Sequence, residues 1–269
     1  MIARVDGCEL SYDDIGRGSP VVFLHAFPLD RTMWAAQTSA LAAEQRCLAI
    51  DLRGFGESAA APPYSMDRYA GDVVAVLDTA RVDRATIVAL SMGGYVAFAL
   101  WRRYANRVRA LVLADTKATA DAPDARDRRR ELIEVARTDG SEAVAARQSV
   151  GILGKTTRER RPDIVSTVHG IMARASVDGI IGALEAMLAR PDSTPTLATI
   201  SVPTLVVAGE EDVITPPKEA RALHQEIAGS RLEILSGAGH LSNIERPAAF
   251  NAVLGEFLHS SESAEARAV

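Results

Sequence analysis

The sequence has few of the residues that define several large classes of protein. It contains only two cysteines, Cys8 and Cys47, in 269 residues, which is too few for a disulfide framework or a cysteine-rich metal site. Both lie within strand-like stretches, so we expect them to be reduced packing residues. The sequence therefore does not indicate a small secreted protein held together by disulfides.

Long apolar runs and an excess of positive charge are also missing. No uninterrupted apolar run reaches the roughly 18 to 20 residues that a membrane helix requires. The first residues, Met1-Ile-Ala-Arg-Val-Asp-Gly, carry charges where a secretory signal would have its apolar stretch. The formal net charge is -5, whereas a nucleic-acid backbone normally requires a strongly basic face. We expect a cytoplasmic protein whose partners include neither a membrane nor a nucleic acid.

The residues that are present form an alternating pattern. After a short hairpin around Asp6-Gly7, apolar runs typical of buried strands alternate with segments of helical spacing. Strands that alternate with helices predict a parallel sheet with helices on both faces. The predicted strands are 21–24, 47–50, 85–90, 108–114, 202–208 and 232–235, and the predicted helices are 31–43, 67–79, 91–104, 217–228 and 247–258.

Between about 116 and 199 the strand signals vanish, and the chain becomes helical in pattern and rich in charge. We predict four or so helices inserted as a cap, 118–199, into a core made of 1–117 and 200–262, with a frayed tail at 263–269. The cap has basic runs at 126–130 and 158–161. These runs either guide an anionic substrate or, as is more common, form the solvated faces of amphipathic helices.

Ser91 carries the sharpest local signal, in Ala89-Leu90-Ser91-Met92-Gly93-Gly94, where a buried strand meets a helix. A serine can occupy the tip of so tight a turn only if the residues two positions away are very small, as Ala89 and Gly93 are. Its hydroxyl would then point outward from the carboxyl edge of the sheet, beside the amide N–H of Met92. The alternative is a serine that merely caps the helix.

A serine hydroxyl is a poor nucleophile and needs a base, which a carboxylate holds in the right tautomer. Of the five histidines, His240 is the best candidate because it follows the strand 232–235 in a glycine-rich segment. The others are weaker candidates: His169 lies in the cap, His224 in a surface helix, His259 near the predicted tail, and His25 at the end of the first parallel strand.

Asp212 is the predicted carboxylate, because it follows the strand 202–208 at the same edge of the sheet. Glu210 and Glu211 are adjacent competitors, and Asp115 is a second position from which a carboxylate could reach the histidine. The chain order serine, aspartate, histidine, with every member at a carboxyl strand end, favours a catalytic set.

The segment His25-Ala26-Phe27-Pro28 follows the first parallel strand and supplies a second oxyanion donor, for which we predict the N–H of Phe27. His25 is interpreted as a structural hydrogen-bonding residue or a second base. The segment 51–58 contains neither the Gly-Lys-Ser/Thr of a phosphate loop nor the third glycine of a dinucleotide fingerprint, so we interpret it as a turn beside the site.

Apolar side chains near the predicted site are candidates for substrate contacts. They are Trp34 after the oxyanion segment and Met172 and Met187 in the cap, with His25 as a further candidate. Apolar residues at helical spacing are also what the core of a cap requires. The sequence therefore leaves pocket lining and cap packing open for them.

Taken together, the motifs resemble the α/β-hydrolase superfamily over nearly the whole chain. The elbow around Ser91, the acid segment Gly209-Glu-Glu-Asp212, the histidine segment Gly239-His240, the oxyanion segment and the turn at 51–58 occur in the family's order. Ala26 and Ala89 each replace a glycine of the family's pattern. Capped carboxylesterases, 3-oxoadipate enol-lactonases and cofactor-free perhydrolases are the most similar members. The serine argues against haloalkane dehalogenases and epoxide hydrolases, whose nucleophile is an aspartate.

The resemblance implies a mostly parallel eight-stranded sheet with helices on both faces and an inserted helical cap. It also implies serine-dependent hydrolysis of a small-molecule ester or lactone, with Ser91, Asp212 and His240 catalytic, and Phe27 and Met92 as oxyanion donors. Such a reaction uses no metal and no organic cofactor. The alternatives are a perhydrolase or haloperoxidase-like activity, and a non-catalytic ligand receptor on the same fold.

Overall fold

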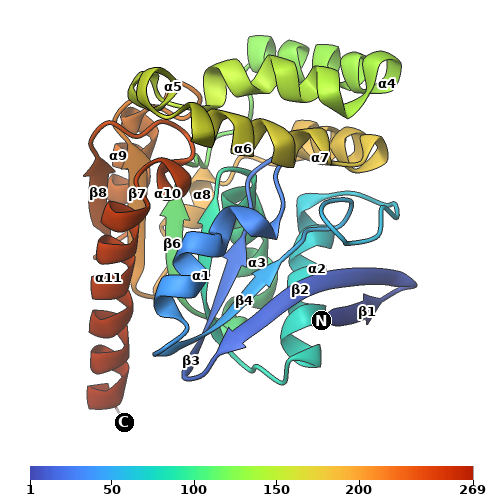
Figure 1. Ribbon diagram of the computed structural model, residues 1–269. Helices are drawn as coiled ribbons and strands as arrows, with labels where there is room; N and C mark the ends of the chain where they lie inside the picture. The colour runs from blue at the N-terminus through green and yellow to red at the C-terminus, as the bar shows by residue number, and fades with distance from the viewer. Residues whose placement is uncertain (269) are drawn as a thin grey trace.

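Eight strands form one sheet within residues 1–268, the part of the chain that the computed structural model describes; side chains are described except at Val150 and 263–268. The strand order is β1-β2-β4-β3-β5-β6-β7-β8 (Figure 1). The pairs β1–β2 and β2–β4 are antiparallel, and all later neighbours are parallel. This confirms the predicted mostly parallel sheet. The strands are β1 (Ile2–Val5), β2 (Cys8–Gly16), β3 (Ser19–Leu24), β4 (Gln45–Ile50), β5 (Ala85–Leu90), β6 (Val108–Ala114), β7 (Thr204–Gly209) and β8 (Arg231–Leu235).

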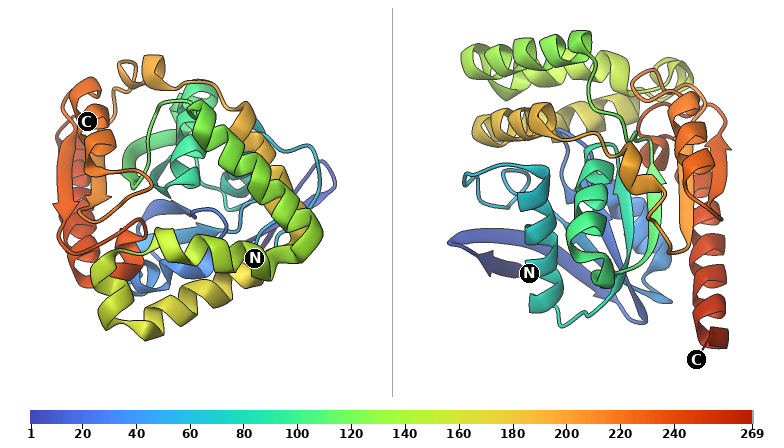
Figure 2. Two further views of the ribbon diagram at one scale, coloured as in Figure 1. Left: turned by 90° about the horizontal axis from the view of Figure 1, so that it is seen from above. Right: turned by 180° about the vertical axis from the view of Figure 1, so that it is seen from behind.

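Helices cover both faces of the sheet, because successive side chains of each strand point to opposite faces. In β3, Val22 and Leu24 belong to one apolar cluster, and Val21 and Phe23 belong to the other. The first cluster includes α2 (Met66–Thr79), α3 (Met92–Tyr104) and α9 (Pro217–Glu226). The second packs against η1 (Arg31–Trp34), α1 (Ala35–Leu41) and α11 (Pro247–Ala268). Figure 2 shows α2 and α3 side by side on the face seen from behind.

Five helices follow one another between β6 and β7, and Figure 1 shows three of them, α4, α6 and α7, over the carboxyl ends of the strands. Gly140, with φ 81°, interrupts the long helix α4, and Ser176 starts α7 by accepting a hydrogen bond from the N–H of Gly179 at 2.9 Å. The helices are α4 (Pro123–Ile152), α5 (Lys155–Arg160), α6 (Pro162–Ala173), α7 (Val177–Ala189) and α8 (Thr194–Leu197).

Two helix predictions differ from the structure. The predicted helix 31–43 is divided into the 3-10 helix η1 and the α-helix α1, and ends at Leu41. The last helix, predicted to end near 258 before a frayed tail, continues through residues 263–268, while Val269 lies outside the described residues. Alanine, glutamate and arginine dominate this segment and have high helix propensity, so the helix can continue without apolar side chains.

Three short segments connect the larger elements. The first two are η2 (Ala105–Arg107), between α3 and β6, and α10 (Ser242–Glu245), just before α11. The third is the turn at 51–58, in which the ring of Phe55 meets the ring of Phe27 edge-on, with 6.1 Å between the ring centroids. Within residues 1–268, no helix combines the length and hydropathy needed to cross a bilayer.

The start of α5 is tied to the loops that follow β7 and β8. The N–H of His240 donates to the carbonyl of Ile152 at 3.1 Å. In return, the N–H of Gly154 donates to the buried carboxylate of Glu245 at 2.8 Å. A Cβ on Gly239 would lie 2.1 Å from the amide nitrogen of Gly154, so the two backbones can meet only because these residues are glycines. The inserted helices thereby hold the histidine loop in place.

Candidate active site

Ser91 lies at the tip of a tight turn between β5 and α3. Its backbone is in a strained region, with φ 54° and ψ -111°. The turn is held by the N–H of Ser91, which donates to the carbonyl of Ala114 at 2.9 Å, and by Thr116 Oγ1, which donates to the carbonyl of Ser91 at 2.8 Å. A Cβ on Gly93 would lie 2.4 Å from the carbonyl oxygen of Leu24. The turn therefore needs a glycine at this position, as the sequence indicates.

A chain of hydrogen bonds runs from Ser91 to Asp212 through His240. The Oγ of Ser91 lies 2.8 Å from Nε2 of His240, and Nδ1 of His240 lies 2.8 Å from Oδ2 of Asp212. The three residues follow β5, β7 and β8, whose carboxyl ends meet at one edge of the sheet. The structure thus brings together the three side chains that the sequence selected.

Asp212 and His240 are both buried, and each changes the proton affinity of the other. Burial alone would raise the pKa of Asp212, but the charge and hydrogen bond of His240, with further hydrogen bonds from Thr215, hold this pKa below its ordinary value. Burial alone would lower the pKa of His240, but the facing carboxylate outweighs burial and raises it. Asp212 is therefore ionised at neutral pH and stabilises a proton on the imidazole.

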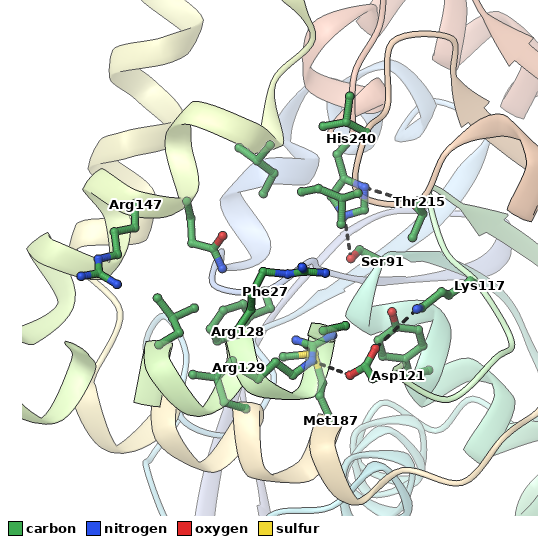
Figure 3. Close-up of a pocket in the computed structure, with 18 of the residues that line it drawn as sticks. Phe27, Ser91, Lys117, Asp121, Arg128, Arg129, Arg147, Met187, Thr215 and His240 are labelled. Atoms are coloured by element: carbon green, nitrogen blue, oxygen red, sulfur yellow. Dashed lines mark hydrogen bonds and ion pairs between the residues drawn. The ribbon is translucent and has the colours of Figure 1, made fainter. Parts of the chain in front are cut away.

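A cavity of about 480 Å³ opens over Ser91 and His240, between the sheet edge and the inserted helices. Four charged side chains, those of Lys117, Asp121, Arg128 and Arg129, also line the cavity (Figure 3). The lining also includes apolar and amide side chains: Phe27, Tyr95, Leu132, Gln148, Ile152, Leu184, Met187, Val213 and Ile214. The arrangement provides a hydroxyl, a base and a space in which a small molecule can meet both.

Known proteins share this architecture. The family model for the alpha/beta hydrolase fold matches residues 19–247. The chain belongs to the α/β-hydrolase family. The 3-oxoadipate enol-lactonase 2 of Acinetobacter baylyi is 31% identical over 245 residues, which are 90% of each chain. This confirms the resemblance that the sequence motifs indicated.

Two solved structures resemble this hydrolase closely. A thermophilic esterase from Thermogutta terrifontis, solved with malate bound, has a TM-score of 0.93 and 36% identity and covers 97% of this chain and 98% of its own. The enol-lactonase of Burkholderia xenovorans LB400 has a TM-score of 0.90 and 34% identity and covers 96% of this chain and 100% of its own. Both are similar to this hydrolase along their whole length.

Asp115, the alternative acid, is directed elsewhere. Its carboxylate accepts hydrogen bonds from the N–H of Gly209 at 2.8 Å and from the hydroxyl and N–H of Ser242. Burial, followed by the nearby charge of Asp212, raises the pKa of Asp115 to about 8. Asp115 therefore joins the end of β6 to β7 and α10, and it is the carboxylate of Asp212 that faces the histidine.

The other two acidic competitors also hold loops. Glu210 accepts hydrogen bonds from the hydroxyl and amide of 236–237, and Glu211 accepts one from the N–H of Thr156 at 2.7 Å. Within the described residues, no group of three or more histidine, cysteine or acidic side chains is placed to hold a metal ion. The hydrogen-bonding geometry at this edge thus favours Asp212 over its neighbours.

The two predicted oxyanion donors come from segments near Ser91, and their role stays a prediction. Phe27 lines the cavity, and Met92 is the first residue of α3, where helix N–H groups have no acceptor in the preceding turn. Within residues 1–268, neither of the two amides donates to another protein group. Both remain able to donate to an oxygen placed beside Ser91.

Three of the four candidate substrate contacts are buried and do not line the cavity. His25 is fully buried and accepts a hydrogen bond from the N–H of Leu52 at 3.0 Å, which holds the turn at 51–58. Trp34 packs against Phe23 in the core, and Met172 is fully buried in the same apolar cluster. These side chains satisfy the packing of the fold and do not line the cavity. Met187 alone lines the pocket as predicted.

Several residues that line the cavity are not among the contacts that the sequence predicts. Lys117 follows the end of β6 by three residues, and Val213 and Ile214 directly follow Asp212. Their closeness to carboxyl strand ends is the sequence feature that indicates a place near the site. Arg129 belongs to a basic run in which neighbouring residues face in different directions, since Arg130 is exposed and pairs with Asp127. The run alone does not say which arginine turns inward.

Proposed function

We propose that this hydrolase cleaves a small-molecule carboxylic ester or lactone through an acyl-enzyme formed on Ser91. The observation that carries the proposal is the continuous hydrogen-bonded chain from Ser91 Oγ through His240 to Asp212 Oδ2, beside a cavity that Ser91 and His240 line. Similarity to proteins named as an enol-lactonase and an esterase supports the same reaction class.

The first half of the reaction acylates the serine. Ser91 Oγ attacks the carbonyl carbon while its proton passes to Nε2 of His240. The ionised Asp212 stabilises the resulting imidazolium. When the tetrahedral intermediate collapses, the bond to the alcohol oxygen breaks, and the alcohol leaves with the proton from Nε2. The acyl group stays on Ser91 as an ester.

The second half returns the enzyme to its starting state. A water molecule gives a proton to Nε2 of His240 and attacks the acyl carbon. The new tetrahedral intermediate releases the carboxylic acid, and Ser91 Oγ recovers its proton from His240. The amides of Phe27 and Met92 donate to the negatively charged oxygen in both intermediates, where a fixed donor is most effective. In a lactone the alcohol and acid remain on one molecule.

The test is a Ser91→Ala variant assayed on a panel of esters graded by acyl length, alcohol size and lactone ring. Loss of the nucleophile should lower kcat by about a thousandfold or more on every substrate that the wild type cleaves, given the size of such losses elsewhere. Unchanged circular dichroism would show that the fold is intact. A variant that keeps most of its activity would contradict the assignment of Ser91.

Two other activities remain predictions from the sequence. A perhydrolase would form peracid from acetate and hydrogen peroxide, which is assayed directly. A non-catalytic receptor would bind small esters without hydrolysing any of the panel. The intact hydrogen-bond chain at Ser91 supports hydrolysis over a receptor, because a binding site alone does not need a base within 2.8 Å of a serine hydroxyl.

A further inference from the structure

One wall of the cavity holds more positive than negative charge. Asp121 is a single carboxylate shared by three cations: Arg190, Arg129 and Lys117. Its two oxygens accept hydrogen bonds from Arg190 at 2.8 and 2.9 Å, and one also accepts from Arg129 at 2.6 Å. These hydrogen bonds and charges outweigh burial and hold the pKa of Asp121 far below its ordinary value. At neutral pH three positive charges therefore surround one negative charge.

Lys117 and Arg129, the cations that face the cavity, have N–H donors without a strong acceptor. Lys117 has a mostly covered side chain, 19% exposed, and its ammonium lies 3.4 Å from Asp121, beyond ordinary hydrogen-bond length. Arg129 uses one of its donors on the thioether sulfur of Met187 at 3.1 Å, which is a weak acceptor. A negatively charged group in the cavity would give both side chains a stronger partner.

The other charged lining residues do not remove this imbalance. Arg128 pairs with Asp124, but both side chains are about two-thirds exposed, so solvent weakens the pair. Glu131 and Arg147 have opposite charges, and both are exposed at the cavity. The excess of positive charge therefore remains at the more covered cations, Lys117 and Arg129.

Lys117 lines the same cavity as Ser91, and the residue before it is hydrogen-bonded to the nucleophile. The preceding residue, Thr116, donates its hydroxyl hydrogen bond to the carbonyl of Ser91 at 2.8 Å. Figure 3 shows Lys117 and Asp121 on the same side of the pocket as Ser91. An anionic group held by Lys117 would therefore lie within the reach of a small molecule whose carbonyl is at Ser91.

We propose that the substrate carries a carboxylate, which Lys117 and Arg129 bind while its ester or lactone carbonyl meets Ser91. This inference rests on the proposed function and adds the chemical class of the substrate. Lys117 determines specificity in this account and takes no part in bond making.

The experiment compares two methyl esters of similar length, monomethyl succinate and methyl pentanoate, in a pH-stat. The quantity measured is kcat/KM for monomethyl succinate divided by kcat/KM for methyl pentanoate. It is measured in the wild type and in Lys117→Met, Lys117→Arg and Arg130→Gln. Only monomethyl succinate has a carboxylate that can accept a charge-assisted hydrogen bond from Lys117. Lys117→Met should therefore lower this ratio about tenfold. Lys117→Arg should restore most of the ratio.

Arg130→Gln is the matched control, because it removes the same charge from an exposed position in α4 that does not line the cavity. Its ratio should stay within about twofold of the wild type, as exposed ion pairs contribute little. Equal ratios in wild type and Lys117→Met would overturn the carboxylate site while leaving ester hydrolysis by Ser91 intact.

If the wild type cleaves neither ester, calorimetric titration with monomethyl succinate tests the carboxylate site instead. The proposed function fails only if the wild type also cleaves none of the ester and lactone panel. Weaker binding to Lys117→Met than to wild type and Arg130→Gln would support the carboxylate site. Equal binding to all three proteins, or binding to none, would overturn it.

Discussion

At the residue scale, two buried aspartates at this edge of the sheet have opposite proton affinities. The pKa of Asp212 is held low by His240 and by hydrogen bonds from Thr215, despite burial. The pKa of Asp115 is raised to about 8, by burial first and then by the charge of Asp212. Asp115 therefore holds a proton much more readily than Asp212, which is ionised at neutral pH. Only the ionised carboxylate can stabilise an imidazolium at His240.

This difference predicts opposite results for two amide substitutions. Asp212→Asn should lower kcat by about four orders of magnitude on a methyl ester, because the neutral amide no longer stabilises the imidazolium or fixes its tautomer. Asp115→Asn should keep most of the activity near pH 7, because the side chain of Asp115 bonds to Gly209 and Ser242 and does not face His240. Steady-state kinetics on methyl pentanoate measures both, and the reverse result would transfer the role of the acid to Asp115.

The catalytic candidates could be predicted from the sequence because their positions are fixed by the backbone. Ser91, Asp212 and His240 each follow an apolar strand, and parallel strands bring such positions to one edge. The pocket wall could not be predicted in this way. Arg129 and Arg130 are adjacent and chemically identical, and only the packing of α4 turns Arg129 toward Asp121. The sequence leaves pocket lining and core packing open for Trp34 and Met172 for the same reason, since apolar side chains suit a pocket and a core equally.

At the element scale, α7 is fixed to the turn at 51–58 by a contact between two glycines. Ser176 Oγ, which also caps α7, donates to the carbonyl of Gly54 at 2.8 Å. A Cβ on Gly179 would lie 1.9 Å from that same carbonyl oxygen. The helix can therefore approach the turn only while position 179 has no side chain.

Gly179→Ala should accordingly lower the free energy of unfolding by about 1 to 3 kcal/mol, the usual effect of overpacking. The matched control is Gly170→Ala in α6, where an added Cβ meets no atom within 4 Å. This change should raise stability by roughly 0.5 to 1 kcal/mol, because alanine favours the helix. Urea unfolding measures both, and equal effects of the two substitutions would contradict the contact with Gly54.

The elements themselves were predictable to different degrees. Buried strands such as β5 and β6 are short apolar runs bounded by breakers, so their sequence specifies them closely. The interruption of α4 at Gly140 and the division of the segment 31–41 into η1 and α1 were not foreseen. Both depend on how the helices meet their neighbours, which helical spacing alone does not encode.

At the scale of the whole molecule, the inserted helices share their apolar core with the sheet. Leu184 and Met187 of α7 belong to the same cluster as Val22 and Leu24 of β3. The insertion therefore cannot bury its apolar faces alone, although the boundaries 118–199 remain a proposal. The charge is distributed unevenly as well: the chain has a net charge of -5, while one wall of its cavity is cationic. Net charge thus says little about what the site binds.

If the hydroxyl of Ser91 is an activated nucleophile, a fluorophosphonate should label it covalently. Intact mass and peptide mapping should show a single adduct on Ser91 in the wild type, and the Ser91→Ala variant should show none. His240→Gln, which removes the base, should label far more slowly. A folded wild type that gains no adduct, or gains it on another residue, would contradict the account.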